Sequence, residues 1–145
     1  MLVYIEQKIT EETGCAFMTE KNTEKKKILI LDDKKETTDF IELLLEMEQF
    51  EVRSLNNPIE LVPILKKEQF DLLLLDIMMP GLDGWQVTRL IKSEKEHKKM
   101  PIIILSCLTD KKSKFIAKKF GVDDFVEKPF SPEVLVSKIK KLLGM

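Results

Sequence analysis

The chain has little cysteine, little net charge and no long hydrophobic run, and each shortage excludes a class of protein. Its two cysteines, Cys15 and Cys107, are far apart and lack metal-ligand spacing, so neither a disulfide framework nor a cysteine metal site is expected. The formal net charge of -1 gives no overall attraction to nucleic acid or to an anionic membrane. No apolar run is long enough to span a bilayer, and the first residues lack a signal-peptide core. We therefore expect a cytoplasmic protein without membrane insertion or direct nucleic-acid contact.

The first 26 residues differ from the rest of the chain. They are polar and end in a charged run, whereas regular hydrophobic patterning begins at residue 27. We expect a partly flexible N-terminal extension at 1–26 and one domain at 27–145, which is long enough to bury its own core. The sequence leaves open whether translation starts at Met1 or at Met18.

From residue 27 the sequence alternates between apolar runs and amphipathic segments. Three of the runs are continuously apolar, which is typical of strands covered on both faces. Five strand–helix repeats predict an α/β fold, a flavodoxin-like doubly wound parallel sheet with strand order 2-1-3-4-5. The predicted strands are 28–31, 51–55, 71–76, 102–106 and 123–128. The predicted helices lie around 40–47 and at 58–67, 85–93, 110–120 and 132–143.

Two shorter signals concern the connections. Residues 78–84 carry two glycines and a proline, which predicts a turn-rich loop. Ser131, Pro132 and Glu133 form a helix start, with Ser131 as the N-cap and Pro132 at the first helical position.

Polar side chains stand at the carboxyl ends of four predicted strands. Asp32 and Asp33 follow the first strand, and Asp76 ends the third. Ser106 ends the fourth, and Lys128 ends the fifth. Because the carboxyl ends of parallel strands share one edge, where ligands bind, we expect these five side chains to converge.

Such a cluster needs a cation. Two carboxylates about 4 Å apart repel by roughly 4 kcal/mol at an effective dielectric of 20. Oxygen ligands of this kind suit Mg²⁺, and Mn²⁺ is an alternative. Lys128 adds positive charge for phosphoryl oxygens, and the central Asp76 is then placed to act as a nucleophile.

Four segments carry a family resemblance. LILDD, LLLDIMMPGLDGW, IIILS and DDFVEKPF resemble, in order and spacing, the signature segments of response-regulator receiver domains of the CheY-like superfamily. The resemblance covers 27–143 and implies a signalling switch rather than an enzyme. Such a switch takes a phosphoryl group from a phosphohistidine of a sensor histidine kinase or a histidine phosphotransfer protein. A downstream protein partner then reads the change.

The resemblance also implies roles for single residues at the predicted metal site. Asp76 matches the phosphoacceptor and a metal ligand, Asp33 the direct metal ligand, and Asp32 an acidic neighbour that acts through water. Met78 matches the position that offers a backbone carbonyl to the metal.

Further positions match the family's switch. Lys128 corresponds to the lysine that pairs with Asp76 or its phosphoryl group, and the Lys128–Pro129 bond to a cis peptide. Ser106 corresponds to the switch hydroxyl and Phe125 to the aromatic switch residue. The expected output surface is the fourth helix, fifth strand and fifth helix.

Other functions are less consistent with the residues. A haloacid-dehalogenase-type hydrolase would carry a second aspartate where Met78 stands, and the chain has no P-loop. A single-domain regulator is expected because the chain ends soon after the last predicted helix. A fragment of a larger regulator and a phosphorylation-independent adaptor remain alternatives.

Residues outside the central cluster support further predictions. Met78 and Leu108 are apolar where polar side chains can orient an attacking water, so we hypothesise slow self-dephosphorylation. Cys107 is expected to be a small buried residue and His97 to lie in a solvated charged segment. A set of lysines is either a solubilising face or a partner surface. These are Lys111, Lys112, Lys114, Lys118 and Lys119.

Overall fold

The computed structural model describes residues 24–79, 82–107 and 111–145. Its centre is a five-stranded sheet in which every neighbouring pair of strands is parallel. The order β2-β1-β3-β6-β7 is 2-1-3-4-5 when these five strands are counted along the chain, so the predicted topology is confirmed. The strands are β1 (Lys27–Leu31), β2 (Glu51–Leu55), β3 (Leu72–Asp76), β6 (Ile102–Ser106) and β7 (Asp124–Glu127).

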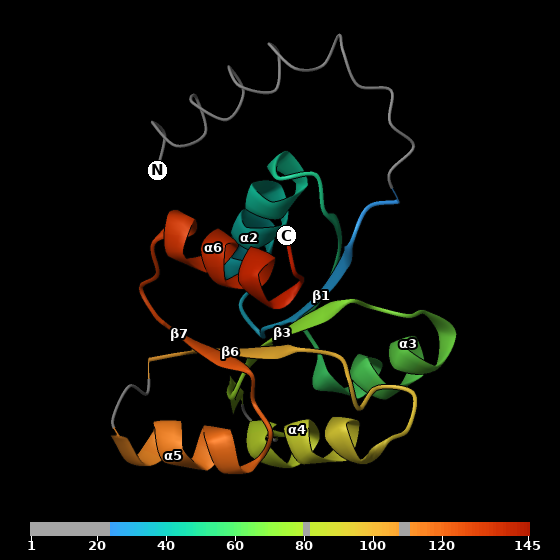
Figure 1. Ribbon diagram of the computed structural model, residues 1–145, viewed down its shortest axis with the longest axis vertical. Coiled ribbons are helices and arrows are strands. Elements are labelled where there is room, and N and C mark those ends of the chain that lie inside the picture. Colours follow the sequence, from blue (N-terminus) through green and yellow to red (C-terminus); the bar gives the residue numbers. More distant parts are fainter. Residues whose placement is uncertain (1–23, 80–81, 108–110) are drawn as a thin grey trace, which may run out of the picture.

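Helices cover both faces of the sheet (Figure 1). They are α2 (Lys35–Met47), α3 (Leu61–Lys67), α4 (Gly84–Ser93), α5 (Lys111–Lys119) and α6 (Pro132–Leu142). α2 and α6 lie on one face, and α3, α4 and α5 lie on the other. None of the helices in the described part of the chain has the length and apolar character needed to cross a membrane.

The alternation of side chains along each strand divides the core into two clusters. Ile28 and Ile30 of β1 belong to the cluster that includes the buried side chains of α2 and α6. Leu29 and Leu31 belong to the cluster that includes those of α3 and α4. All four side chains are 0% exposed. Because each such burial stabilises the fold by about 1.5–3 kcal/mol, β1 is fixed firmly and its carboxyl end is well positioned.

The structure differs from the sequence prediction in the connections. The predicted helix at 58–67 begins as a 3-10 turn, η1 (Pro58–Glu60), and becomes α-helical at α3. The predicted loop at 78–84 contains a short antiparallel pair, β4 (Met78–Met79) and β5 (Leu82–Asp83). Two residues a strand are too few to produce a recognisable alternation in sequence.

The start of α6 is also different in detail. Ser131 occupies the N-cap position, but its side chain caps no backbone N–H. Its hydroxyl instead donates to the Glu133 carboxylate over 2.7 Å, so the predicted N-cap position of Ser131 is confirmed while the hydrogen bond expected of a cap is not made. A charged acceptor two residues away competes with the backbone for the hydroxyl.

Gly84 stands where a side chain has no room. A Cβ at this position would lie 2.7 Å from the Ile77 Cα, a contact with backbone that cannot move aside cheaply. We expect Gly84→Ala to lower the free energy of unfolding by about 2 kcal/mol, because overpacking shifts the backbone that follows Asp76. Urea unfolding followed by circular dichroism measures this. Ser137→Ala, on the exposed side of α6, is the control and should change it by less than about 0.5 kcal/mol. Equal midpoints for both variants would contradict the expectation.

Candidate functional site

Three carboxylates meet at the carboxyl edge of the sheet. Asp32 and Asp33 follow β1 directly, and Asp76 is the last residue of β3, the neighbouring strand. One carboxylate oxygen from each of the three lies within 4.8 Å of the others. Asp32 and Asp76 are buried, at 0% and 4% exposed, whereas Asp33 is exposed. The structure therefore brings together the acidic residues that the sequence predicted to converge.

Lys128 lies between the two buried carboxylates. It follows β7 directly, and its backbone N–H donates to the Ser106 carbonyl over 2.9 Å. Its Nζ is 2.8 Å from Asp32 Oδ2 and 3.4 Å from Asp76 Oδ2. The Lys128–Pro129 peptide bond is cis, as the resemblance implied. One ammonium thus faces two buried carboxylates, and the shorter of the two contacts is to Asp32.

Burial dominates the electrostatics of Asp76. Desolvation raises the pKa of Asp76, although the Met78 N–H and the Lys128 ammonium act in the opposite direction. Burial lowers the pKa of Lys128, but hydrogen bonding and attraction to Asp32 and then Asp76 outweigh it, and the net direction is upward. The cluster thus has three carboxyl groups and one ammonium. A further cation beside the carboxyl groups would stabilise it.

The donor set fits a hard divalent cation. Three carboxylates with oxygens within 4.8 Å of one another offer the ligands that Mg²⁺ or Mn²⁺ prefers. Asp76 has a second interaction that orients it, because the Met78 backbone N–H donates to its Oδ1 over 2.9 Å. Nothing in these contacts involves the Met78 carbonyl, whose part in metal binding stays a prediction.

A second layer of polar groups holds Asp32 in place, and none of its hydrogen bonds was predicted from the sequence. The Lys34 N–H donates to Asp32 Oδ1 over 3.0 Å. The Asn56 side-chain amide donates to the Asp32 carbonyl over 2.8 Å and to the Thr38 hydroxyl over 3.0 Å. Asn56 follows β2 directly, so it is the polar residue at the carboxyl end of the one strand from which no site residue was predicted.

Ser106 and Phe125 lie on the strands beside the carboxylates. Ser106 ends β6 and is 1% exposed, one residue beyond Leu105, which pairs with Asp76 in the register. Phe125 lies on β7 opposite Ile104 and is partly buried against the core. Their positions agree with the resemblance, and their switching roles stay predictions.

Two expectations outside the cluster are wrong. His97 is 5% exposed rather than solvated, because the turn after α4 folds back through hydrogen bonds from the His97 N–H to Glu94 and from the Met100 N–H to His97. Cys107 is exposed rather than buried, because the chain leaves the sheet after Ser106. Met78 is 58% exposed, and Leu108 lies outside the described residues, as do Cys15 and residues 1–23.

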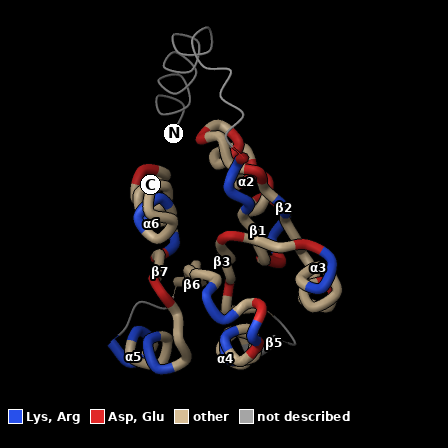
Figure 2. Tube along the Cα trace, turned by 45° about the vertical axis from the view of Figure 1, so that its right-hand side comes forward, with Lys and Arg blue, Asp and Glu red and all other residues tan. Residues whose placement is uncertain are grey.

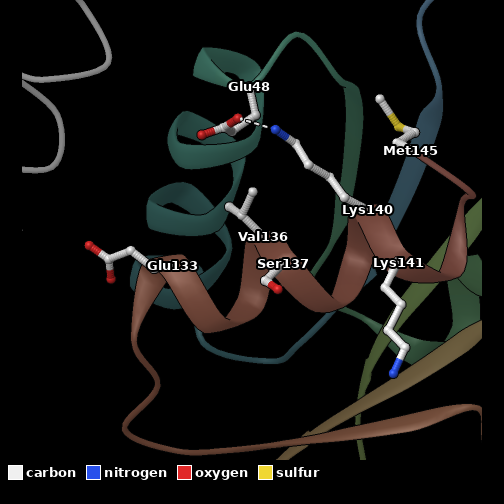
Figure 3. Close-up of a pocket in the computed structure, with 7 residues that line it drawn as sticks. All are labelled: Glu48, Glu133, Val136, Ser137, Lys140, Lys141 and Met145. Carbon is white, nitrogen blue, oxygen red and sulfur yellow. Dashed lines mark hydrogen bonds and ion pairs between the residues drawn. The ribbon is translucent and has the colours of Figure 1, made fainter.

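A separate hollow of about 560 Å³ opens between α2 and α6 (Figure 3). Lys140 spans it and pairs with the buried Glu48 carboxylate over 3.0 Å. None of the predicted site residues lines it, so it belongs to the packing of the two helices rather than to the acidic cluster. Its lining residues are Glu48, Glu133, Val136, Ser137, Lys140, Lys141 and Met145.

Known proteins resemble this chain in sequence and in fold. The family model of the response regulator receiver domain matches residues 28–140. The transcriptional regulatory protein GltR of Pseudomonas aeruginosa is 37% identical over 116 residues, which cover 80% of this chain and 48% of that protein. The chain therefore spans about half the length of this curated relative.

Solved structures of receiver domains have a similar fold. A response regulator receiver domain protein from Methanospirillum hungatei has a TM-score of 0.76 and 29% identity, covering 83% of this chain and 95% of its own. The receiver domain of a signal transduction histidine kinase from Syntrophus aciditrophicus has a TM-score of 0.75 and 30% identity, covering 82% and 90%. Together with the family match over most of the chain, these likenesses show that the chain belongs to the response regulator receiver domains.

Proposed function

We propose that this chain is the phosphoacceptor receiver of a two-component or phosphorelay system and that Asp76 carries the phosphoryl group. The observation that supports the proposal most is the pairing of the buried Asp76 carboxylate with Lys128 at the edge where three strands end. The donor is a phosphohistidine of a sensor histidine kinase or of a histidine phosphotransfer protein.

The transfer is a displacement at phosphorus. An Asp76 carboxylate oxygen forms the new O–P bond, the P–N bond to the donor imidazole breaks, and the imidazole leaves with its electron pair. Asp76 is oriented for this by the Met78 N–H at Oδ1 and by Lys128 at Oδ2. Lys128 also supplies positive charge for the phosphoryl oxygens.

The acidic residues would hold the metal. Asp33 and Asp76 would bind it directly, the Met78 carbonyl would add a further ligand, and Asp32 would act through water. When bound, Mg²⁺ or Mn²⁺ neutralises charge on the carboxylates and on the phosphoryl oxygens. The burial of Asp32 and the exposure of Asp33 favour this division of roles, because the exposed carboxylate is the more accessible of the two.

The output is a change in the surface formed by α5, β7 and α6, read by a downstream protein. Ser106 and Phe125 would carry the change, because Ser106 ends β6, the strand next to that of Asp76, and Phe125 lies on β7 within that surface. A slow loss of the phosphoryl group, a cytoplasmic location, and the flexible extension at 1–26 stay predictions.

Phosphorylation by a small donor tests the proposal. The full chain is incubated with acetyl phosphate, with and without Mg²⁺, and its intact mass is recorded. We expect one phosphoryl group per chain that needs Mg²⁺, survives acid and is lost in base. Absence of the adduct at every Mg²⁺ concentration would contradict the proposal and favour an adaptor that keeps the fold without the chemistry.

Metal binding should depend on pH through Asp76. Its raised pKa means that the folded protein binds a proton there more readily than the unfolded chain. Without metal, that proton adds stability as the pH falls and the contribution is lost as the pH rises through the folded pKa. With Mg²⁺ at about 100 times its Kd, we expect stabilisation of about 2.7 kcal/mol near neutral pH.

This stabilisation by Mg²⁺ should shrink as the pH falls, because protons compete with the metal. The decrease should begin at a pH above the ordinary titration range of aspartate. Thermal unfolding between about pH 7 and about pH 5 measures it, with NaCl at equal ionic strength as the control. An increment that stays constant over this range would show that Asp76 does not titrate at the metal site.

A further inference from the structure

α5 presents an exposed aromatic side chain inside a group of lysines. Phe115 is 67% exposed, although it lies in the middle of the helix. The residues three and four positions before and after it are Lys112, Lys111, Lys118 and Lys119, and all four are exposed. Residues at these spacings are neighbours on a helix surface, so the five side chains form one surface, here named the α5 face. The lysine positions recur along the α5 trace in Figure 2.

The opposite side of α5 is the one that holds the helix to the protein. Ala117 is buried, and Phe120, just beyond the helix, stacks on Trp85 of α4 with ring centroids 6.2 Å apart. Phe115 takes no part in this packing, and the long lysine side chains around it leave most of its ring open to solvent. A single exposed apolar residue is ordinary, and what distinguishes Phe115 is the group of four exposed lysines around it.

Two of the four lysines are not placed for the stability of the helix, whereas Lys118 and Lys119 lie in its last turn, where positive charge is favourable. Lys111 and Lys112 are the first two residues of α5, and its first turn has no acidic residue. Positive charge at a helix N-terminus opposes the helix dipole. The acidic residues that follow α5 are already paired elsewhere, Asp123 with Lys92 and Asp124 with Lys138. Among the described residues no ion pair neutralises the four lysines, so the positive charge of the α5 face is available to a partner.

We propose that the α5 face binds an acidic segment of a partner protein, with an apolar side chain of that segment on Phe115 and its carboxylates on the lysines. The size of the surface favours a short segment, since nine residues of helix extend over about 13 Å. The chain as a whole has a net charge of -1 because its 25 acidic residues outnumber its 24 basic ones, and the exposed Glu127 lies on β7, the strand that follows α5. A lipid surface or a long polyanion would meet these acidic residues too. The α5 face is part of the output surface proposed above, so this inference rests on that proposal and names the chemistry of its partner, while the test below uses the unphosphorylated protein and needs no phosphoryl transfer.

A designed peptide tests the proposal on the full chain. The probe is a fluorescent helical peptide that carries one leucine with glutamates three and four positions to either side. A second peptide with lysine in place of every glutamate is the control. We expect saturable binding of the acidic peptide only, weakened about tenfold or more between roughly 0.05 M and 0.5 M NaCl.

Variants distinguish the contribution of Phe115 to peptide binding from that of the lysines. Phe115→Ala should weaken binding about tenfold, because an aromatic residue at the centre of a contact contributes most. The double variant Lys111→Glu, Lys118→Glu should weaken it at least as much and remove most of the salt dependence. Two controls on other exposed surfaces, Leu90→Ala and the charge-matched Lys98→Glu, Lys99→Glu, should stay within about twofold of the unchanged protein.

Thermal unfolding distinguishes lost binding from lost structure. The single variant Lys111→Glu places a negative charge at the helix N-terminus, so it should raise the melting temperature while it weakens binding, whereas Lys118→Glu acts in the opposite direction in the last turn. The proposal is overturned if the acidic peptide does not bind at about millimolar concentration, or if the α5 variants bind it as the controls do. It is equally overturned if vesicles with anionic lipid or a single-stranded oligonucleotide bind more tightly with the same dependence on Phe115.

Discussion

Replacing Asp76 by asparagine should abolish phosphorylation by acetyl phosphate and, at the same time, stabilise the metal-free protein. The first effect follows from chemistry, since an amide oxygen cannot form the acyl phosphate that a carboxylate forms. The second follows from burial. The Asp76 carboxylate is 4% exposed, its pKa is raised by desolvation, and Asp32 adds a second negative charge to the same site.

The asparagine keeps the shape and can still accept the Met78 N–H, while Lys128 remains paired with Asp32. We therefore expect the free energy of unfolding of Asp76→Asn to rise by about 1 kcal/mol near neutral pH. Its stabilisation by Mg²⁺ should also be smaller. Intact mass and urea unfolding measure the two effects on the same sample.

Asp39→Asn is the matched control for Asp76→Asn. Asp39 is an exposed residue of α2 that pairs with Lys35, away from the predicted site residues. This variant should be phosphorylated as the unchanged protein is, with stability altered by less than about 0.5 kcal/mol. An Asp76→Asn variant that still gains a phosphoryl group would remove Asp76 from the role assigned to it.

Lys128→Met should have the opposite effect on stability. It leaves the buried carboxylates of Asp32 and Asp76 without the ammonium that now lies 2.8 Å and 3.4 Å from them. Removing one partner of a buried ion pair costs about 3–5 kcal/mol, and we expect about 3 kcal/mol because 16% of the Lys128 side chain is exposed. Phosphorylation should be lost or slowed at least about a hundredfold, since that charge also faces the phosphoryl oxygens.

Four comparisons isolate the charge effect of Lys128→Met. The loss of stability should shrink at low pH, where the carboxylates bind protons, and on addition of Mg²⁺, which neutralises them. The second substitution Asp76→Asn should recover part of it, because one of the unpaired charges is removed. Lys35→Met removes a pair between exposed side chains and should cost less than about 1 kcal/mol. If both lysine variants lose the same stability, the buried arrangement is not what Lys128 stabilises.

The sheet and the meeting of its polar ends could be predicted from sequence. β3 and β6 are continuous apolar runs, which have no other place than the middle of a sheet covered by helices. Once the strand order is known, the residues that end β1, β3 and β7 must share an edge. That is why Asp32, Asp76 and Lys128 were expected together before any distance was known.

The features that could not be predicted from sequence depend on the conformations of loops and side chains in the folded protein. The closer approach of Lys128 to Asp32 than to Asp76 is a matter of side-chain geometry at a crowded edge. The bonds from Asn56 to Asp32 and Thr38 join residues from three segments of the chain, and no local pattern marks them. Burial of His97 likewise follows from the way the turn after α4 folds back rather than from its charged neighbours in sequence.

The most direct test is to identify chemically which carboxylate carries the phosphoryl group. The protein is phosphorylated with acetyl phosphate and Mg²⁺ and treated with borohydride, which reduces an acyl phosphate of aspartate to homoserine. Peptide mass spectrometry then reads the modified position. We predict homoserine at position 76 alone. Homoserine at Asp32 or Asp33, or a phosphoryl group retained on a serine, threonine or histidine, would contradict the account.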